Sequence, residues 1–508
     1  MFYPLTVRDF LDRAETVYPD RVALVDEPDQ PAGSWKEITY RELAARARGQ
    51  AAWLDRLGVP HGGRVAVVSQ NSARLLTSFF GVSAWGRILV PINFRLTAPE
   101  VDYIVGHSGA EILLLDPELR DLADAVTAPR TFVFGEDDAE IFASGGDPEP
   151  WQGDEGATCT INYTSGTTAR PKGVQLTHRN AWLNATTFAL HTTITDADVL
   201  LHTLPLFHVN GWGIPYAVTG LGGRHILLRK IDGHEILRRV RRHGVTLLCA
   251  APAVVNSVLD AAREWKDGPV PGRDRVRVIV AGAPPPTRTI QAVREELGWE
   301  FIQIYGLTET SPLLTVNRMR GEWETLGSED AARNLGRAGA PALGVRMSVS
   351  EDGEVLARSN HSLAAYWQDP DATAAAQAED WFHTGDGGTF EGGYLTILDR
   401  KKDVIITGGE NVSSIEVEDA LCSHPSVREA AVVGLPDERW GEAVTAVVVT
   451  DDGRPVTEDD LIEHCHRALA GYKCPKSVRF VDSLPRTATG KTQKFRLREA
   501  LPRSTPAD

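Results

Sequence analysis

Short apolar runs alternate along the chain with longer segments in which apolar residues repeat every three or four positions. The apolar runs are residues 65–68, 112–115, 246–250, 276–281 and 301–305. Runs of this length are typical of buried strands, whereas Val7, Phe10, Leu11 and Ala14 repeat as one face of a helix. The alternation of strands and helices predicts an α/β fold with layered, largely parallel sheets.

The pattern changes near Asp399. Residues 318–335, before that point, are charged and interrupted by glycine, which predicts a surface excursion. Beyond it, residues 430–433 and 443–449 predict a strand pair, and a helical pattern follows over 457–469. We therefore expect a large N-terminal domain of layered α/β sheets and a small, mobile α+β C-terminal domain. The predicted domains are residues 1–398 and 399–508.

Composition excludes several classes of protein. Of 508 residues, 53 are Lys or Arg and 69 are Asp or Glu, a net charge of −16, which argues against a general nucleic-acid or polybasic membrane binder. The five cysteines are odd in number and include no C-x-x-C pair, so we expect no disulfide framework and a reducing, cytoplasmic setting. The longest apolar stretch, residues 245–255, is too short to cross a bilayer.

The most informative segment is residues 163–174, where hydroxyl side chains surround Gly166. Backbone N–H and hydroxyl groups in such a loop can bind phosphate oxygens, and Lys172 adds a positive charge. Pro171 before that lysine and Gly173 after it exclude a Walker A loop. Taken alone, the segment also fits a polar turn between a strand and a helix.

As a whole, this string resembles the phosphate loop of the adenylate-forming superfamily, which includes acyl-CoA synthetases, adenylation domains and firefly-type luciferases. Further segments resemble that family in the same order: 205–208 (acyl pocket), 281–284 and 303–309 (adenine and magnesium), 384–386 and 399–403 (ribose and hinge), and 485–491 (catalytic lysine). One departure is Ala169, where the family usually has Gly, so the mobility of the loop is in question.

The resemblance implies an ATP site with Mg²⁺. Thr164 and Glu309 would supply the oxygen ligands that a hard cation prefers. Asp386 would accept hydrogen bonds from ribose hydroxyls, and Tyr305 would offer its ring to adenine, with core packing as the alternative. The implied nucleotide-binding residues are Thr164, Ser165, Gly166, Thr167, Thr168, Lys172, Gly282, Ala283, Pro284, Gln303, Ile304, Tyr305, Gly306, Thr308, Asp386, Arg400 and Lys491.

The resemblance also assigns catalytic roles. Lys491 would bridge a carboxylate and the α-phosphate that it attacks, which lowers the repulsion between two anions and stabilises the transition state. Glu309 and His208 complete the implied catalytic set. Asp399 would be the hinge about which the small domain turns between two half-reactions.

A thiol acceptor would approach after that rotation. Glycines at 408 and 409 would let a pantetheine arm pass close to the backbone. Lys401 and Lys402 could meet the phosphates of CoA, although solvated charges are an equally good interpretation. The predicted CoA-binding residues are Lys230, Lys401, Gly408, Gly409 and Glu410.

The acyl-pocket segment indicates the type of acid. Residues 207–212 contain no carboxylate to balance a buried ammonium, which disfavours an α-amino acid. His208, Val209, Asn210 and Trp212 are expected to line an apolar pocket, so a fatty, aryl or polycyclic acid is favoured. Trp212 as core and His208 as a packing histidine remain alternatives.

These observations together predict an ATP-dependent acid–CoA ligase that forms acyl-AMP and releases AMP and pyrophosphate, with ATP, Mg²⁺ and CoA as cofactors. A stand-alone enzyme that loads an acyl or peptidyl carrier protein is a close alternative. A luciferase-like oxygenase and a non-catalytic homologue are further alternatives. A homodimer is implied only by the resemblance, and neither nucleic acid nor integral membrane contact is expected.

Overall fold

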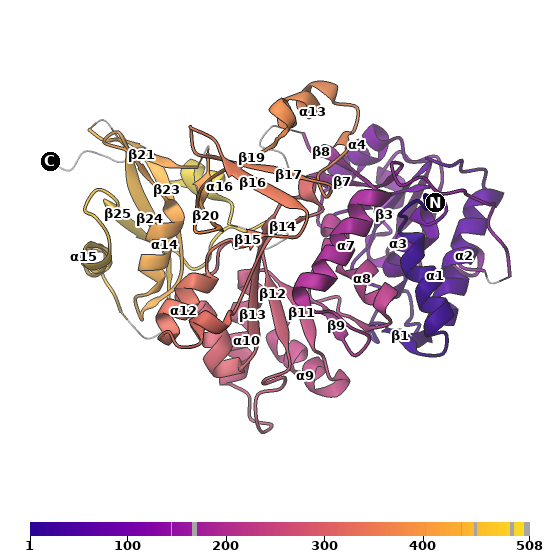
Figure 1. Ribbon diagram of the computed structural model, residues 1–508, viewed down its shortest axis with the longest axis horizontal. Coiled ribbons are helices and arrows are strands. Elements are labelled where there is room, and N and C mark those ends of the chain that lie inside the picture. The colour runs from indigo at the N-terminus through magenta and orange to yellow at the C-terminus, as the bar shows by residue number, and fades with distance from the viewer. Residues whose placement is uncertain are drawn as a thin grey trace.

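The computed structural model describes residues 1–143, 145–164, 170–401, 403–437, 439–451, 455–487 and 492–501. Three sheets and their helices form a large body, coloured from indigo to orange in Figure 1, and the smaller yellow part lies at one end of it. Helices and strands alternate along most of the chain, which confirms the predicted α/β class.

A nine-stranded sheet, in the order β15-β14-β13-β12-β11-β9-β10-β1-β2, contains the predicted runs at 246–250, 276–281 and 301–305. Its six central strands, from β13 to β1, are parallel, and the strands at both edges are antiparallel. The strands are β1 (Val22–Val25), β2 (Glu37–Thr39), β9 (Val199–His202), β10 (Arg224–Leu227), β11 (Leu247–Ala250), β12 (Arg277–Val280), β13 (Glu300–Gly306), β14 (Leu313–Arg318) and β15 (Ala340–Pro341).

A second sheet has seven strands in the order β18-β8-β7-β4-β3-β5-β6. Strands β7, β4, β3, β5 and β6 are parallel, and β8 folds back on β7. The strands are β3 (Arg64–Val68), β4 (Ile88–Ile92), β5 (Ile112–Leu115), β6 (Thr131–Val133), β7 (Thr158–Thr164), β8 (Lys172–Thr177) and β18 (Ala365–Tyr366). Residues 65–68 and 112–115 are therefore strands, as predicted.

Two antiparallel sheets flank the boundary between the large and small parts. The four-stranded sheet comprises β16 (Val345–Val349), β17 (Glu354–Ser359), β19 (Phe382–Glu391) and β20 (Tyr394–Arg400). The sheet of the small part comprises β21 (Ile405–Thr407), β22 (Glu410–Val412), β23 (Val427–Asp437) and β24 (Gly441–Thr450), with β25 (Ser477–Phe480) parallel to β24. The predicted pair 430–433 and 443–449 forms the centre of β23 and β24.

The helices cover the sheets. They are α1 (Arg8–Val17), α2 (Tyr40–Arg56), α3 (Ala73–Ser83), α4 (Ala98–Ser108), α5 (Leu122–Ala125), α6 (Asp138–Ile141), α7 (His178–Thr192), α8 (Ile214–Leu221), α9 (Gly233–His243), α10 (Pro252–Arg263), α11 (Thr287–Ala292), α12 (Ser328–Leu335), α13 (Pro370–Ala376), α14 (Ser414–Cys422), α15 (Glu458–Ala468) and α16 (Lys494–Ala500). Helix α1 buries Phe10, Leu11 and Ala14, the predicted face.

The predicted surface excursion at 318–335 is wrong in its second half. This segment ends in α12, which buries Ala331, Ala332 and Leu335. Ala332 and Leu335 join the apolar cluster beneath the nine-stranded sheet. The charged residues of this helix face solvent and masked the short apolar stripe in the sequence.

The buried apolar residues divide at the same place as the sheets. Among the described residues, four clusters contain only residues up to Leu395, and two contain only residues from Ile405 onward. The small part therefore has a core of its own, built on β23, β24, α14 and α15. The side-chain hydrogen bonds that join the two parts include those of Thr287, Arg288 and Asp399.

One such contact joins the ends of α11 and α14. Asp419 of α14 accepts hydrogen bonds from the backbone N–H (2.8 Å) and hydroxyl (3.0 Å) of Thr287, the first residue of α11. Arg288 in turn donates to the carbonyl oxygens of His424 (3.2 Å) and Val427, just beyond the end of α14. The N-terminal end of α11 thus receives a carboxylate from the small part, and the chain just after α14 receives the Arg288 guanidinium.

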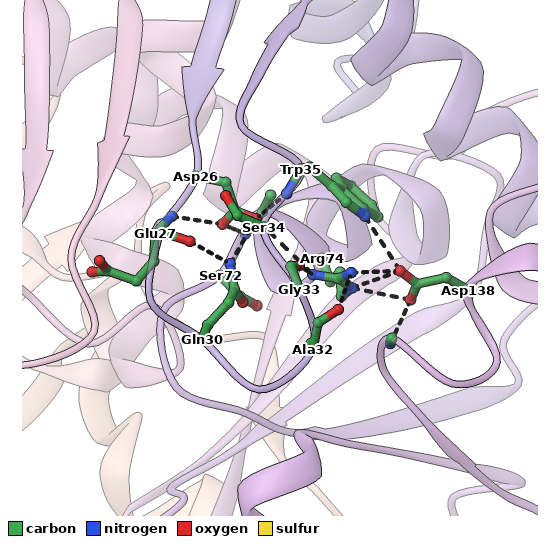
Figure 2. A network of polar contacts seen from close by, with 12 residues as sticks. Asp26, Glu27, Gln30, Ala32, Gly33, Ser34, Trp35, Ser72, Arg74 and Asp138 are labelled. Atoms are coloured by element: carbon green, nitrogen blue, oxygen red, sulfur yellow. Dashed lines mark hydrogen bonds and ion pairs between the residues drawn. The ribbon is translucent and has the colours of Figure 1, made fainter.

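A buried polar network connects the two large sheets (Figure 2). Asp26, next to the end of β1, accepts hydrogen bonds from Trp35 N (2.9 Å) and Ala73 N (3.0 Å). Arg74 of α3 binds both carboxylate oxygens of Asp138 and the carbonyls of the loop before Trp35. Burial raises the pKa of Asp26. The network joins β1, α3 and α6, although the buried amide oxygen of Gln30 has no hydrogen-bond partner among the described residues.

Two further predictions concern cysteines and membranes. All five cysteines are free and buried, as the absence of a disulfide pattern predicts. Within the described ranges, every helix is either too short or too polar to span a membrane.

Candidate nucleotide and acyl site

The carboxyl ends of β12 and β13 lie side by side at one edge of the nine-stranded sheet, because these strands are parallel neighbours. Ligands of open α/β sheets bind at such edges. Gly282 follows β12 with a φ of 97°, and Ala283 and Pro284 continue this turn. At the end of β13, a Cβ on Gly306 would lie 1.5 Å from the Pro312 carbonyl oxygen, so this position requires glycine. The two predicted adenine segments, residues 281–284 and 303–309, therefore lie next to each other at this edge of the sheet.

A polar cluster links this edge to the four-stranded sheet. The Tyr305 hydroxyl donates to Asp386 Oδ2 at 2.8 Å, and Arg400 Nε lies 3.7 Å from Asp386 Oδ1. Asp386 and Arg400 are cross-strand partners on β19 and β20, which explains their proximity. Burial and the neighbouring Asp386 carboxylate raise the pKa of Tyr305 well above its usual value, so the phenol remains a donor.

A second cluster lies around Glu309, four residues beyond Tyr305. Glu309 Oε1 accepts a hydrogen bond from the Tyr366 hydroxyl at 3.0 Å. Lys172 Nζ lies 5.1 Å from the centre of the Tyr366 ring and 3.8 Å from Asp369 Oδ2. Burial, together with the Glu309 carboxylate, raises the pKa of Tyr366. The Lys172 ammonium and the Glu309 carboxylate thus both lie next to the Tyr366 side chain.

The same cluster includes the end of the predicted phosphate loop. Thr164 ends β7 and pairs with Lys172, which begins β8. The hydroxyl of Thr164 and the carboxylate of Glu309 are hard oxygen donors, the ligand type that Mg²⁺ prefers. Lys172, whose side chain is 37% exposed, can reach a phosphate. The donor set therefore fits a magnesium-bound polyphosphate.

Two buried residues of β13, Gln303 and Ile304, complete the predicted nucleotide segment. The amide oxygen of Gln303 is buried and has no hydrogen-bond partner among the described residues. Thr308 begins the short helical turn that carries Glu309. A buried acceptor next to Tyr305 is consistent with a ligand that brings a donor.

The acyl-pocket segment packs between the seven-stranded sheet and α7. Asn184 of α7 donates to the Trp212 carbonyl at 3.1 Å and accepts from Leu313 N at 3.2 Å, which joins this segment to the strand after Glu309. Asn210 lies 3.2 Å from the Thr160 hydroxyl of β7. The predicted acyl segment is therefore adjacent to the predicted magnesium segment.

The backbone of the acyl segment is unusual. Residues 209–212 all have positive φ, including 39° at Val209, a conformation that β-branched residues rarely adopt. Val209, Asn210 and Trp212 are buried, and His208 is half-buried with its backbone N–H bonded to Pro205 O at 3.1 Å. Backbone strain of this kind concentrates at functional sites.

Some predicted residues lie outside the described residues. They are Ser165, Gly166, Thr167, Thr168 and Ala169 of the phosphate loop, Lys402, and Lys491. The chain is described up to Thr487 and again from Thr492: Arg486 pairs with Thr492, and Gln493 N donates to Pro485 O at 2.8 Å.

The predicted CoA residues are spread over both parts of the molecule. Gly408 and Gly409 form the turn between β21 and β22, and Gly408 N donates to Trp440 O at 2.8 Å within the small part. Glu410 begins β22 and is exposed. Lys401 forms ion pairs with Asp352 (2.5 Å) and Glu354 (3.3 Å) of the large part. Lys230 is exposed beyond the end of β10, so the structure does not gather this set at one place.

Asp399, the predicted hinge, lies inside β20 and pairs with Gly387. Its carboxylate accepts hydrogen bonds from Arg400 N (2.8 Å) and the Ser414 hydroxyl, and lies 3.8 Å from Lys494 Nζ. The backbone of Asp399 therefore belongs to the sheet of the large part, whereas its side chain contacts the small part.

Sequence reasoning missed three residues that organise the site. Tyr366 holds Glu309, Asn184 holds the acyl segment, and Lys494 contacts the predicted hinge. None of them stands in a motif with a chemical signature. Lys494 offered a weak signal, because it lies three residues after Lys491.

Two family models match the chain. The model described as AMP-binding enzyme matches residues 11–367, and the model described as AMP-binding enzyme C-terminal domain matches residues 416–491. The first alone covers more than half of the chain, and it contains both polar clusters apart from Asp369, Asp386 and Arg400.

The chain is also similar to named proteins over nearly its whole length. It is 37% identical to 2-methylpropanoate–CoA ligase CCL4 of Humulus lupulus, over 98% of this chain and 95% of that protein. It is 36% identical to 4-hydroxybutyrate–CoA ligase 2 of Metallosphaera sedula, over 97% and 94%. The crystal structure of the anthranilate CoA ligase AuaEII with anthranoyl-AMP superposes with a TM-score of 0.87, at 27% identity over 98% of both chains. The chain therefore belongs to the adenylate-forming superfamily of AMP-binding enzymes.

Proposed function

We propose that this enzyme is an ATP-dependent acid–CoA ligase that joins a carboxylic acid to AMP and then to the thiol of CoA. The single observation that carries the proposal is the convergence of Tyr305, Asp386 and Arg400 beside Glu309 and Lys172. A nucleoside needs hydrogen-bond acceptors and a polyphosphate needs cations. Two of the relatives that match nearly the whole chain are named as CoA ligases.

In the first half-reaction, a carboxylate oxygen of the acid attacks the α-phosphorus of ATP, and the bond to pyrophosphate breaks. Asp386 would accept hydrogen bonds from the ribose hydroxyls, and Arg400 would hold the Asp386 carboxylate in place. Glu309 and Thr164 would hold Mg²⁺, which supplies positive charge to the phosphates. Lys172 and Lys491 would add fixed positive charge where the transition state gains negative charge.

In the second half-reaction, the sulfur of CoA attacks the acyl carbon and AMP leaves with the electron pair of the broken C–O bond. We propose that the small domain, beginning near Asp399, turns so that the Gly408–Gly409 hairpin replaces the Lys491 segment. The separate apolar cores of the two parts support independent movement. Lys401 would have to leave Asp352 and Glu354 to meet a CoA phosphate.

We infer that the acid is uncharged and apolar beyond its carboxylate. The segment around Val209 and Trp212 is buried and contains no carboxylate or ammonium between residues 205 and 214. The hydrophobic acids predicted from the sequence, fatty, aryl and polycyclic, belong in the test panel. Two relatives are named for the four-carbon acids 2-methylpropanoate and 4-hydroxybutyrate, so short branched and hydroxylated acids belong there too.

The test measures release of AMP and pyrophosphate from ATP and Mg²⁺ with each acid, in the presence and absence of CoA, together with the thioester product. We expect a CoA-dependent signal with at least one uncharged acid and none with α-amino acids. The Lys491→Ala variant is the negative control for enzyme-dependent product release.

Three outcomes would contradict the proposal. Thioester formation on a holo carrier protein but not on CoA would make the enzyme a carrier-loading one. Acyl-AMP that accumulates and is consumed with oxygen rather than thiol would indicate a luciferase-like enzyme. No release of AMP or pyrophosphate with any acid, together with normal ATP binding, would indicate a non-catalytic homologue. Cytoplasmic location and a homodimer remain predictions.

A further inference from the structure

A buried ionic cluster lies where the small part meets the last strand of the large part. Lys494, the first residue of α16, has a side chain only 16% exposed. Its ammonium lies 2.9 Å from Glu418 Oε1 and 3.8 Å from Asp399 Oδ2, and it donates to the Ser414 hydroxyl. That hydroxyl in turn donates to Asp399. None of these contacts is needed for the reaction chemistry described above.

The cluster is well satisfied. Glu418 also accepts a hydrogen bond from Val432 N of β23 at 2.8 Å, which fixes the orientation of its carboxylate. A buried charge is tolerated when it is paired and hydrogen-bonded. Removal of one partner leaves a buried charge whose desolvation penalty is no longer compensated. Lys494 therefore has one well-defined position, set by α14, β23 and β20 together.

Lys494 lies near Lys491 in sequence, and it lies near the ribose cluster through its contact with Asp399. Along the chain it follows Lys491 by three residues, and the flanks of that segment are held by the Arg486–Thr492 pair and the Gln493–Pro485 hydrogen bond. Through space it contacts Asp399, whose sequence neighbour Arg400 faces Asp386 of the ribose cluster. A series of contacts thus runs from the ribose cluster to Lys494, three residues after Lys491.

We propose that Lys494 is a positioning residue for the first half-reaction, which holds the segment carrying Lys491 to the strand carrying Arg400 through the Asp399 carboxylate. This inference rests on the proposed function, since it assigns Lys491 to acyl-AMP formation. The proposal gives Lys494 no contact with ATP or with the acid. Small displacements of a catalytic group cost large factors in rate, because the reacting geometry is narrow.

The test compares Lys494→Met, Lys494→Arg and the control Lys473→Met. Lys473 also forms an ion pair with α14, through Glu416 at 2.7 Å, but it does not contact Asp399. Two rates are measured: pyrophosphate release from ATP and acid, and thioester formation from CoA and chemically supplied acyl-AMP. For Lys494→Met we expect the first rate to fall about 10²-fold with the KM for ATP nearly unchanged, and the second rate to persist. Lys494→Arg keeps the charge and should retain most of the first rate, and Lys473→Met should behave as wild type.

A double-mutant cycle provides the decisive readout. If Lys494 acts through Lys491, then Lys494→Met adds no further loss in a Lys491→Ala background. Additive losses, or an equal loss of both half-reactions, would overturn the inference and make Lys494 a structural residue of the small part. If Lys491→Ala is inactive and Lys494→Met is fully active, the inference about Lys494 is refuted and the proposed role of Lys491 stands. Full activity of Lys491→Ala would instead refute the proposed role of Lys491, and the inference with it.

Discussion

Two charged clusters meet at the end of β20, where Arg400 belongs to one and its neighbour Asp399 to the other, and they differ in how complete they are. At the ribose cluster, Arg400 is 47% exposed and stands 3.7 Å from Asp386, so its guanidinium still has room for another partner. At the cluster around Lys494, the ammonium is buried among Glu418, Asp399 and Ser414. An open cluster can bind a ligand, whereas a closed one can only fix geometry. The four predictions below test this difference.

The largest expected effect concerns Lys491, which the proposed function assigns to acyl-AMP formation. Lys491→Ala should reduce acyl-AMP formation by about 10²–10³-fold, because a fixed charge at the transition state is lost. Thioester formation from supplied acyl-AMP should persist. Pyrophosphate release and thioester yield measure the two steps separately. Loss of both steps together would mean that this lysine serves the small part as a whole.

The next effect concerns the open cluster. Asp386→Asn removes the charge that would accept ribose hydroxyls, and a hydrogen bond to a charged group contributes about 1.5–3 kcal/mol. We expect the KM for ATP to rise by about 10–100-fold, at 1.4 kcal/mol per tenfold. Glu391→Gln, an exposed carboxylate on the same strand, is the control. An unchanged KM would remove Asp386 from the nucleotide site.

A smaller effect is expected for Tyr305→Phe, which deletes the 2.8 Å hydrogen bond to Asp386 and keeps the ring. The KM for ATP should rise about 5- to 10-fold, the equivalent of about 1 kcal/mol. If the ring alone contacts adenine, the phenylalanine enzyme will bind ATP as wild type does, and the hydroxyl has no role in binding.

The smallest effect concerns pH and the closed cluster. Burial alone would lower the pKa of Lys494, but the Glu418 and Asp399 carboxylates outweigh it and raise the pKa above the usual 10.5. The stability contributed by this shift is therefore complete below pH 10.5 and is lost as the pH rises through the folded pKa.

Lys494→Arg should resist this loss, because a guanidinium keeps its charge at these pH values. Thermal unfolding of both proteins between pH 9 and 11.5 checks the expectation: the midpoint of the wild type should fall faster above pH 10.5. Parallel curves would show that the cluster does not depend on the charge of residue 494.

Much of the fold could be predicted because buried parallel strands are short apolar runs, and residues 112–115 form β5 without an error at either end. The nucleotide segments could be proposed because each carries a motif, and their role in ATP binding stays a prediction. Tyr366 and Asn184 could not, since their roles arise from contacts with Glu309 and Leu313 that are distant in sequence. The same holds for Asp399, whose carboxylate contacts are invisible without the fold of α14 and α16.

The contact between α11 and α14 has a thermodynamic consequence. Thr287 and Arg288 bind Asp419 and main-chain carbonyls, and none of the apolar clusters among the described residues crosses this junction. Water can replace each of these hydrogen bonds when the helix ends separate. A heat-capacity change follows mainly from exposure of apolar surface. Separation of the two parts would therefore leave only a faint calorimetric signature, and its temperature dependence would be shallow.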